Sequence, residues 1–199
     1  PTSIAPWKEG ILVAAPPDIL YLKDIDGDGV SDIRETLISG FKLGVTDSNF
    51  NSLRWSLDNW IHGANGGNGG EIRFAGINKP KTPLKNLDFR FRVDTRQLET
   101  TSQTGGGFGL VFNEWGHSFT TYNIDYLQQR IIPQRYIDQS QKLRSFEATR
   151  NISKHGKMAR IFPIAEAETR VNHPEQAGYF SSAGGMGYLG ISGYPGDLS

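Results

Sequence analysis

The residues whose types and spacing most clearly predict chemistry lie in the segment DIDGDGVSDIRE, residues 24–35. Its acidic residues follow the pattern D-x-D-x-D-G-x5-E, which is typical of calcium-binding loops. Ca²⁺ prefers oxygen ligands, and short acidic side chains on alternate positions of a curled loop can converge on one point. The expected ligands are the side chains of Asp24, Asp26, Asp28, Asp32 and Glu35 and the backbone carbonyl of Val30.

The flanks of this loop differ from those of an EF-hand. The run Leu20-Tyr21-Leu22 before the loop predicts a strand, whereas an EF-hand loop lies between two helices. We therefore expect a calcium loop between strands that has a structural role, in which Glu35 could point away from the ion. The alternative is an acidic turn that is only solvated.

Several segments around the loop predict strands and hairpins. Apolar runs at 11–15 and 19–22 flank a Pro-Pro-Asp turn, and the segment 33–41 suits a strand or one or two helical turns. In NSLRWSLDNWIHGANG, residues 51–66, alternating apolar residues precede an Asp58-Asn59 turn and a return strand begins at Trp60. A related hairpin follows in GFGLVFNEWGHSFTTYN, and the segment 87–93 alternates like a half-buried strand.

These units recur at intervals of roughly 40 to 60 residues, as expected for four-stranded propeller blades with insertions. The pattern therefore predicts an all-β fold that forms part of a propeller, with a β-sandwich as the alternative. The polar segment 126–151 is expected to be an insertion with a short helix after Pro133. The segments 159–171 and 177–196 return to a composition of strands and turns.

Polar side chains near the expected hairpin ends are candidates for a ligand site, because propeller loops gather at one end of a central channel. These residues are Asn51, Arg54, Asn65, Glu71 and Asn123. The competing interpretation is that the asparagines shape turns and that the arginine reaches solvent.

The histidines do not predict a metal site by their spacing. His62, His117, His155 and His173 are far apart, so each is more simply interpreted as structural. His62 and His117 occupy matching hairpin units. Motifs for nucleotide binding and for serine hydrolases are absent, and GGNGG at 66–70 lacks the spacing of a phosphate-binding loop.

Composition excludes several classes of function. The 21 Lys and Arg residues balance 21 Asp and Glu residues, which argues against nucleic acid or an anionic membrane as a partner. Cysteine is absent, so the 199 residues contain no disulfide, thiolate metal site or haem attachment motif. No apolar run is long enough to span a bilayer. The chain starts and stops abruptly, and we expect it to be a piece of a longer protein.

Four stretches in order give the sequence a family resemblance. They are ILVAAPPDILYLKDIDGDGVSDIRETLISGF, NSLRWSLDNWIHGANGGNGGEI, FGLVFNEWGHSFTTYN with IIPQRYI, and AGYFSSAGGMGYLG. Together they resemble the N-terminal part of the planctomycete-type membrane-bound dehydrogenases, which are similar to the quinoprotein glucose/sorbosone dehydrogenases. This resemblance covers nearly the whole chain.

The resemblance implies a six-bladed β-propeller of which residues 1–199 supply about half. It implies oxidation of a sugar or other alcohol with a quinone such as pyrroloquinoline quinone, and electron transfer to a c-type cytochrome module. By motif, Asn51, Arg54, Asn65 and Asn123 would bind substrate or cofactor, and the calcium loop also matches. The place of the catalytic His in the wider superfamily corresponds here to residues 46–50, which contain none, so the catalytic base is not assigned.

The alternative is a non-catalytic, Ca²⁺-stabilised propeller that binds carbohydrate or a protein partner. Because a modest calcium site stays filled only where calcium is abundant, we expect an exported protein in the periplasm or at the cell surface.

Overall fold

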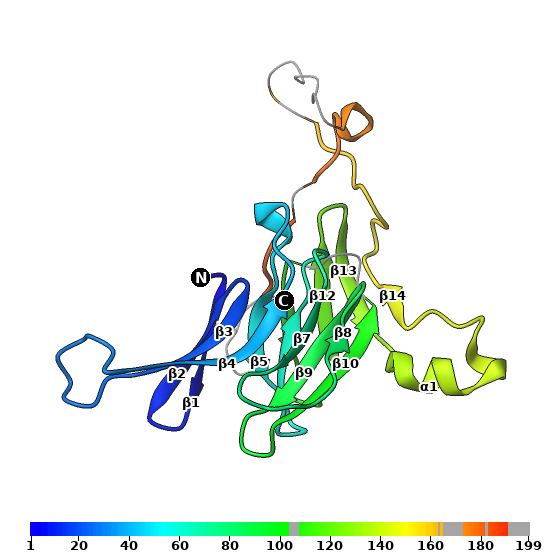
Figure 1. Cartoon of the computed structure of the whole chain (residues 1–199). Coiled ribbons are helices and arrows are strands. Elements are labelled where there is room, and N and C mark those ends of the chain that lie inside the picture. Colours follow the sequence, from blue (N-terminus) through cyan, green and yellow to red (C-terminus); the bar gives the residue numbers. More distant parts are fainter. Residues whose placement is uncertain (104–107, 163, 165–172, 182, 191–199) are drawn as a thin grey trace.

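The computed structural model describes residues 1–103, 108–162, 164, 173–181 and 183–190. The strands form three antiparallel sheets (Figure 1). The strands are β1 Ser3–Trp7, β2 Gly10–Ala15, β3 Asp18–Lys23, β4 Ile33–Phe41, β5 Asn51–Trp55, β6 Ile61–Ala64, β7 Gly70–Phe74, β8 Thr82–Pro83, β9 Leu87–Arg92, β10 Gln97–Gln103, β11 Leu110–Phe112, β12 Ser118–Tyr122, β13 Asp125–Arg130 and β14 Thr149–Asn151. The helices are α1 Gln134–Gln139 and the 3₁₀ turns η1 Thr46–Ser48, η2 Gln141–Leu143 and η3 Pro174–Gln176. The predicted all-β class is confirmed.

The first sheet has the order β1-β2-β3-β4-β7-β8. The two predicted strands around the Pro-Pro-Asp turn are β2 and β3, which pair from Ile11 with Leu22 to Ala15 with Asp18. The segment 33–41, for which the sequence allowed a strand or helical turns, is strand β4. Its register with β3 runs from Lys23 opposite Ile33 to Asp18 opposite Ser39, across one bulge.

The second sheet has the order β10-β9-β6-β5 and contains the predicted hairpin. β5 ends at Trp55 and β6 begins at Ile61, and Asn59 in the turn between them adopts a positive φ of 60°. Asn tolerates this left-handed conformation better than most residues do. The chain between β6 and β9 leaves this sheet to form β7 and β8 at the edge of the first.

The third sheet, β11-β12-β13-β14, corrects the expected insertion at 126–151. The beginning of that segment lies in β13 and its end is β14, and these strands pair from Gln128 with Asn151 to Arg130 with Thr149. Only residues 131–148 lie outside the sheet, and they contain the helix expected after Pro133. Hydrophobic alternation did not reveal these strands because they carry mostly polar residues, with the pattern DYLQQR in β13.

The C-terminal segments are less regular than their composition predicted. Within residues 173–181 and 183–190, the one β contact is a bridge between Tyr179 and Arg160. Most of the segment 163–172 and all of 191–199 lie outside the described residues, so the expectation for those stretches stays a prediction.

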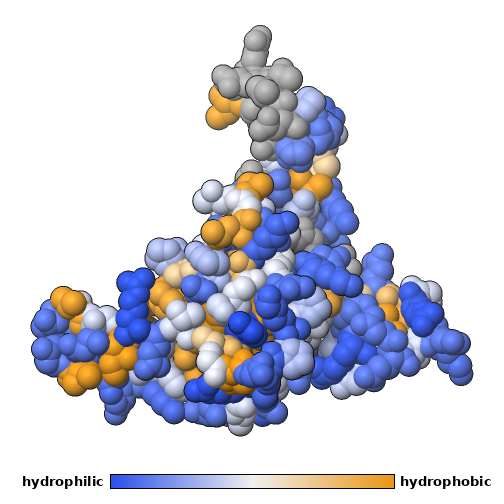
Figure 2. All heavy atoms as spheres, in the orientation of Figure 1, coloured by the Kyte–Doolittle hydropathy of each residue, from blue (hydrophilic) through white to orange (hydrophobic). Residues whose placement is uncertain are grey.

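The hydrophobic core lies between the first and second sheets. It contains fully buried side chains from both sheets, such as Leu12, Ile38 and Ile61, and a group of aromatic rings in which Phe41 and Phe50 stack with centroids 3.7 Å apart. Full burial of one such side chain stabilises the fold by about 1.5–3 kcal/mol. β1, β5 and β11 are the first strands along the chain in the first, second and third sheets. β5 packs against both β1 and β11. Most of the surface in the view of Figure 2 is hydrophilic.

Candidate functional site

The acidic loop connects β3 to β4 and projects from the first sheet (Figure 1). Lys23 and Ile33 pair at its base, and the backbone N–H of Asp32 donates to the carbonyl of Lys23. The loop is therefore closed by the strand pair, as the sequence predicted, and lies outside the sheet interfaces. Ile25 and Val30 are exposed on it and contribute apolar surface to the projection seen in Figure 2.

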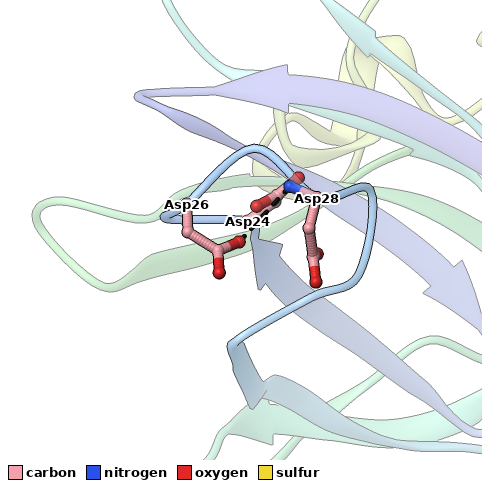
Figure 3. A group of neighbouring side chains, drawn as sticks. All are labelled: Asp24, Asp26 and Asp28. Carbon is pink, nitrogen blue, oxygen red and sulfur yellow. Dashed lines mark hydrogen bonds between the residues drawn. The ribbon is translucent and has the colours of Figure 1, made fainter.

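Three carboxylates converge in this loop. One ligand atom from each of Asp24, Asp26 and Asp28 lies within 4.8 Å of the other two (Figure 3). Asp24 accepts hydrogen bonds from the backbone N–H groups of Gly29 at 2.9 Å and Gly27 at 2.7 Å, and these lower its pKa. Both glycines have positive φ, which lets the loop curl around the carboxylate.

The other expected ligands take different places. Asp32 accepts a hydrogen bond of 2.7 Å from the N–H of Ile25 and so braces the loop from its far end. Val30 donates its N–H to Asp28. Glu35 lies in β4 opposite Tyr21 and is not part of the group of three carboxylates. The donor set is made of hard oxygens, which suit Ca²⁺, Mg²⁺ or Mn²⁺ better than soft metal ions.

Three of the four residues expected to bind substrate or cofactor lie at one end of the sheets. Asn51 begins β5 opposite Ala64, and Asn65 follows directly after β6. Asn123 lies in the turn that follows β12. Gly116 lies in the turn after β11, and Leu57 lies in the turn after β5. The two turns are neighbours, because a Cβ atom added to Gly116 would lie 3.5 Å from Cδ1 of Leu57. The β12–β13 turn therefore lies at the opposite end, which is the end of Asn51 and Asn65.

The fourth residue, Arg54, lies further along β5 opposite His62, toward the other end, and is exposed. Asn65 has a structural role: its amide donates to the carbonyls of Lys85 and Leu87, both at 3.0 Å, and accepts from the N–H of Gly69. The structure thus does not gather these four side chains into one site. Glu71, on β7, is exposed and lies 3.6 Å from Lys81.

A polar site that the sequence did not predict lies between the second and third sheets. Strand register places Arg54, His62, Arg90 and Glu99 in one row across β5, β6, β9 and β10. His62 is buried, and its ring meets that of Phe112 from the third sheet edge to face, with centroids 5.0 Å apart. The signal in the sequence was the alternation of polar residues in IHG, DFRFR and QLETT, but their common face depends on the register.

His62 is paired with an acid in the β5–β6 turn. Its Nε2 lies 3.2 Å from Oδ2 of Asp58, and this oxygen also accepts a hydrogen bond of 2.8 Å from Arg90. Burial lowers the pKa of His62, and the Asp58 carboxylate only partly opposes this. Burial would raise the pKa of Asp58, but His62 and Arg90 outweigh it and hold the pKa at about 2. At neutral pH the imidazole is therefore uncharged and donates from Nε2 to the carboxylate.

A buried ion pair joins the second and third sheets beside this histidine. Nη2 of Arg130 contacts Oδ2 of Asp88, and their side chains are 6% and 0% exposed. Asp88 also accepts a hydrogen bond of 2.6 Å from the N–H of Asn65. This interface therefore contains a buried ion pair, whereas the core between the first two sheets is apolar.

Fold and site together define an all-β protein with three antiparallel sheets, a projecting acidic loop and a polar interface between two of the sheets. The chain belongs to the family described as Domain of unknown function (DUF7133), whose sequence profile matches residues 1–198. No curated protein and no solved structure matches it significantly. Within the described residues, no helix is both long and apolar enough to cross a membrane.

Proposed function

We propose that this chain is about half of a six-bladed β-propeller and that the complete ring oxidises a sugar or another alcohol with a quinone cofactor. The observation that supports the proposal most is the arrangement of the sheets. Strands β1, β5 and β11 each come first in their sheet, and β5 packs against both β1 and β11. Neighbouring innermost strands of this kind are what successive blades present around a shared axis.

The position of Asn51 and Asn123 adds support. Both lie at the end of the sheets where these innermost strands begin, so loops from two neighbouring blades approach one mouth of the channel. Polar side chains on loops at the mouth of a rigid scaffold are suited to hold a ligand. Because Arg54 lies further along β5 and Asn65 serves the fold, the described residues do not assemble a quinone site alone. The rest of the ring must supply the cationic groups and the catalytic base.

The acidic loop has a structural role in this proposal. Asp24, Asp26 and Asp28 hold Ca²⁺, with the carbonyl of Val30 and the carboxylate of Asp32 as further ligands. The ion would cross-link a loop that otherwise gains little from packing, because its side chains are mostly exposed. The calcium requirement agrees with an exported protein in the periplasm or at the cell surface.

The experiment uses the full-length protein with pyrroloquinoline quinone and Ca²⁺, and follows reduction of a redox dye over a panel of sugars and alcohols. We expect turnover that falls by about tenfold in Asn51→Ala and Asn123→Ala, since each substitution removes hydrogen bonds to the ligand. Asn78→Ala, in an exposed loop, is the matched control. If the protein shows no turnover and binds no quinone, the proposal of a dehydrogenase is refuted.

A second candidate function is a non-catalytic propeller that binds carbohydrate or a protein partner. It is favoured by Asn65, whose amide is used entirely for loop structure. It is also favoured by His62 and His117, which lie toward the end of the sheets away from Asn51 and Asn123. Saturable binding of a sugar by a protein that does not reduce the dye would support this candidate.

A further inference from the structure

A cavity of about 240 Å³ lies between the second and third sheets, toward the end away from Asn51 and Asn123. The second sheet contributes His62, Arg90 and Thr101 to its walls, and the third sheet and the chain after it contribute His117, Arg130 and Arg135. The cavity exceeds the roughly 30 Å³ that one water molecule occupies in the liquid, so it can hold a small solute.

Among the described residues that line this cavity, three carry a guanidinium group and none carries a carboxylate. Each arginine is held by an acid that does not line the cavity. Arg90 lies 2.8 Å from Asp58 and 2.7 Å from Glu99, and Arg130 contacts Asp88. Arg90 also stacks on the ring of Trp60, 4.3 Å from its centroid. The acids fix the positions of the guanidinium groups, and N–H donors that the acids do not use, such as Nε of Arg130, stay available to a ligand.

Three buried polar atoms in these walls have no hydrogen-bond partner. They are Nδ1 of His62, Oγ1 of Thr101 and Nε of Arg130. His62 and Thr101 are 7% and 8% exposed, and the side chain of Arg130 is 6% exposed. All three are therefore more than nine-tenths buried. Leaving such an atom unpaired costs about 1–3 kcal/mol, and more for a charged group. Oγ1 of Thr101 and Nε of Arg130 can donate, whereas Nδ1 of the uncharged His62 is an acceptor, so the two donors indicate that an acceptor absent from the protein chain pairs with them.

We infer that this cavity binds the oxyanion group of a small ligand, a carboxylate or a phosphate. Arginine binds both groups well, because its planar fork of N–H donors matches two oxygens of the anion. Nε of Arg130 and the hydroxyl of Thr101 are donors for such oxygens, and Arg135, which is 39% exposed, lies at the rim where a ligand enters. The inference does not depend on the proposed function, because the cavity lies toward the other end of the sheets from Asn51 and Asn123.

The test titrates the full-length protein with inorganic phosphate and, in a separate arm, with acetate, at constant ionic strength set with chloride. The readouts are the ¹H–¹⁵N resonances of the arginine Nε–H groups and the heat of binding. We expect saturable binding of at least one anion together with a shift of the Arg130 Nε–H resonance. The arm that responds identifies the class of oxyanion.

Variants at the rim test the location. We expect Arg135→Gln and His117→Gln to weaken binding by about tenfold, the effect of losing one charge-assisted hydrogen bond. Arg150→Gln, an exposed position of β14 outside the cavity, is the matched control, and melting curves verify that each variant folds. If Arg135→Gln does not fold, Arg135→Lys keeps the charge and removes the fork. Absence of saturable binding in both arms, or an equal loss in Arg150→Gln, would overturn the inference.

Discussion

The ion pair between Arg130 and Asp88 gives the sharpest prediction about how the second and third sheets are held together. The substitution Arg130→Leu removes the guanidinium but keeps an apolar side chain of moderate size. Asp88 is fully buried, so its carboxylate would then lose its contact with Arg130 while it stays desolvated in the interface.

The size of the effect follows from this burial. Removing one partner of a buried ion pair costs about 3–5 kcal/mol, because the other charge stays desolvated. For a domain of this size, each kcal/mol lowers the melting temperature by about 2–4 °C. We therefore expect Arg130→Leu to lower the melting temperature by roughly 6–20 °C.

The assay is thermal unfolding followed by circular dichroism, with Arg150→Leu on the same sheet as the control. The double variant Arg130→Leu with Asp88→Leu should recover part of the loss, because the desolvated carboxylate is then removed as well. A melting temperature of Arg130→Leu within 2 °C of wild type would refute the reasoning and show that water already solvates this interface.

Three further predictions concern the loop, the histidine and the core. Asp24→Asn combined with Asp26→Asn should abolish the rise in melting temperature that Ca²⁺ produces in the intact protein, a rise of roughly 5–11 °C at a free concentration 100 times the dissociation constant. Burial lowers the pKa of His62, so the unfolded chain takes up a proton near pH 6.5 while the folded chain takes it up only at lower pH. The free energy of unfolding is therefore at its full value above pH 6.5 and falls as the pH drops toward the lowered pKa. Between pH 7 and pH 5, the melting temperature of His62→Gln should therefore fall less than that of the wild type. Gly63→Ala would place a methyl group 2.4 Å from the Phe89 ring and should destabilise the core by about 1–3 kcal/mol in urea denaturation.

For each of these three predictions, one result would contradict it. Asp47→Asn, an exposed acid in η1, is the control for the loop, and an unchanged calcium response in the double variant would place the ion elsewhere. Parallel pH curves for wild type and His62→Gln would show that this imidazole is as easily protonated in the folded state as in the unfolded one. Wild-type stability of Gly63→Ala would mean that Phe89 moves aside at no cost.

The sequence predicted features that depend on neighbouring residues. The turn at Asp58-Asn59, the strands on either side of Pro16-Pro17 and the curled acidic loop are all local, because turn residues and alternation determine them. The strand over 33–41 was left open between two structures, since its spacing suited both. Pairing with β3 and β7 decided it.

Features that depend on strand register were not predictable in the same way. His62, Arg90 and Glu99 are far apart in the chain and share one face only because β6, β9 and β10 pair in a particular register. A shift by one residue would place them on the opposite face. The family resemblance grouped Arg54 with Asn51 and Asn65 as ligand-binding residues. The register of β5 places Arg54 opposite His62, away from the end of the sheet where Asn51 and Asn65 lie.

A structure of the full-length protein, determined by cryo-electron microscopy or crystallography with Ca²⁺ present, tests the central claim most directly. The account predicts six antiparallel sheets around one axis, with β1, β5 and β11 innermost in three successive sheets and a cation between Asp24, Asp26 and Asp28. Two sheets stacked face to face, with these three strands on no common axis, would contradict it.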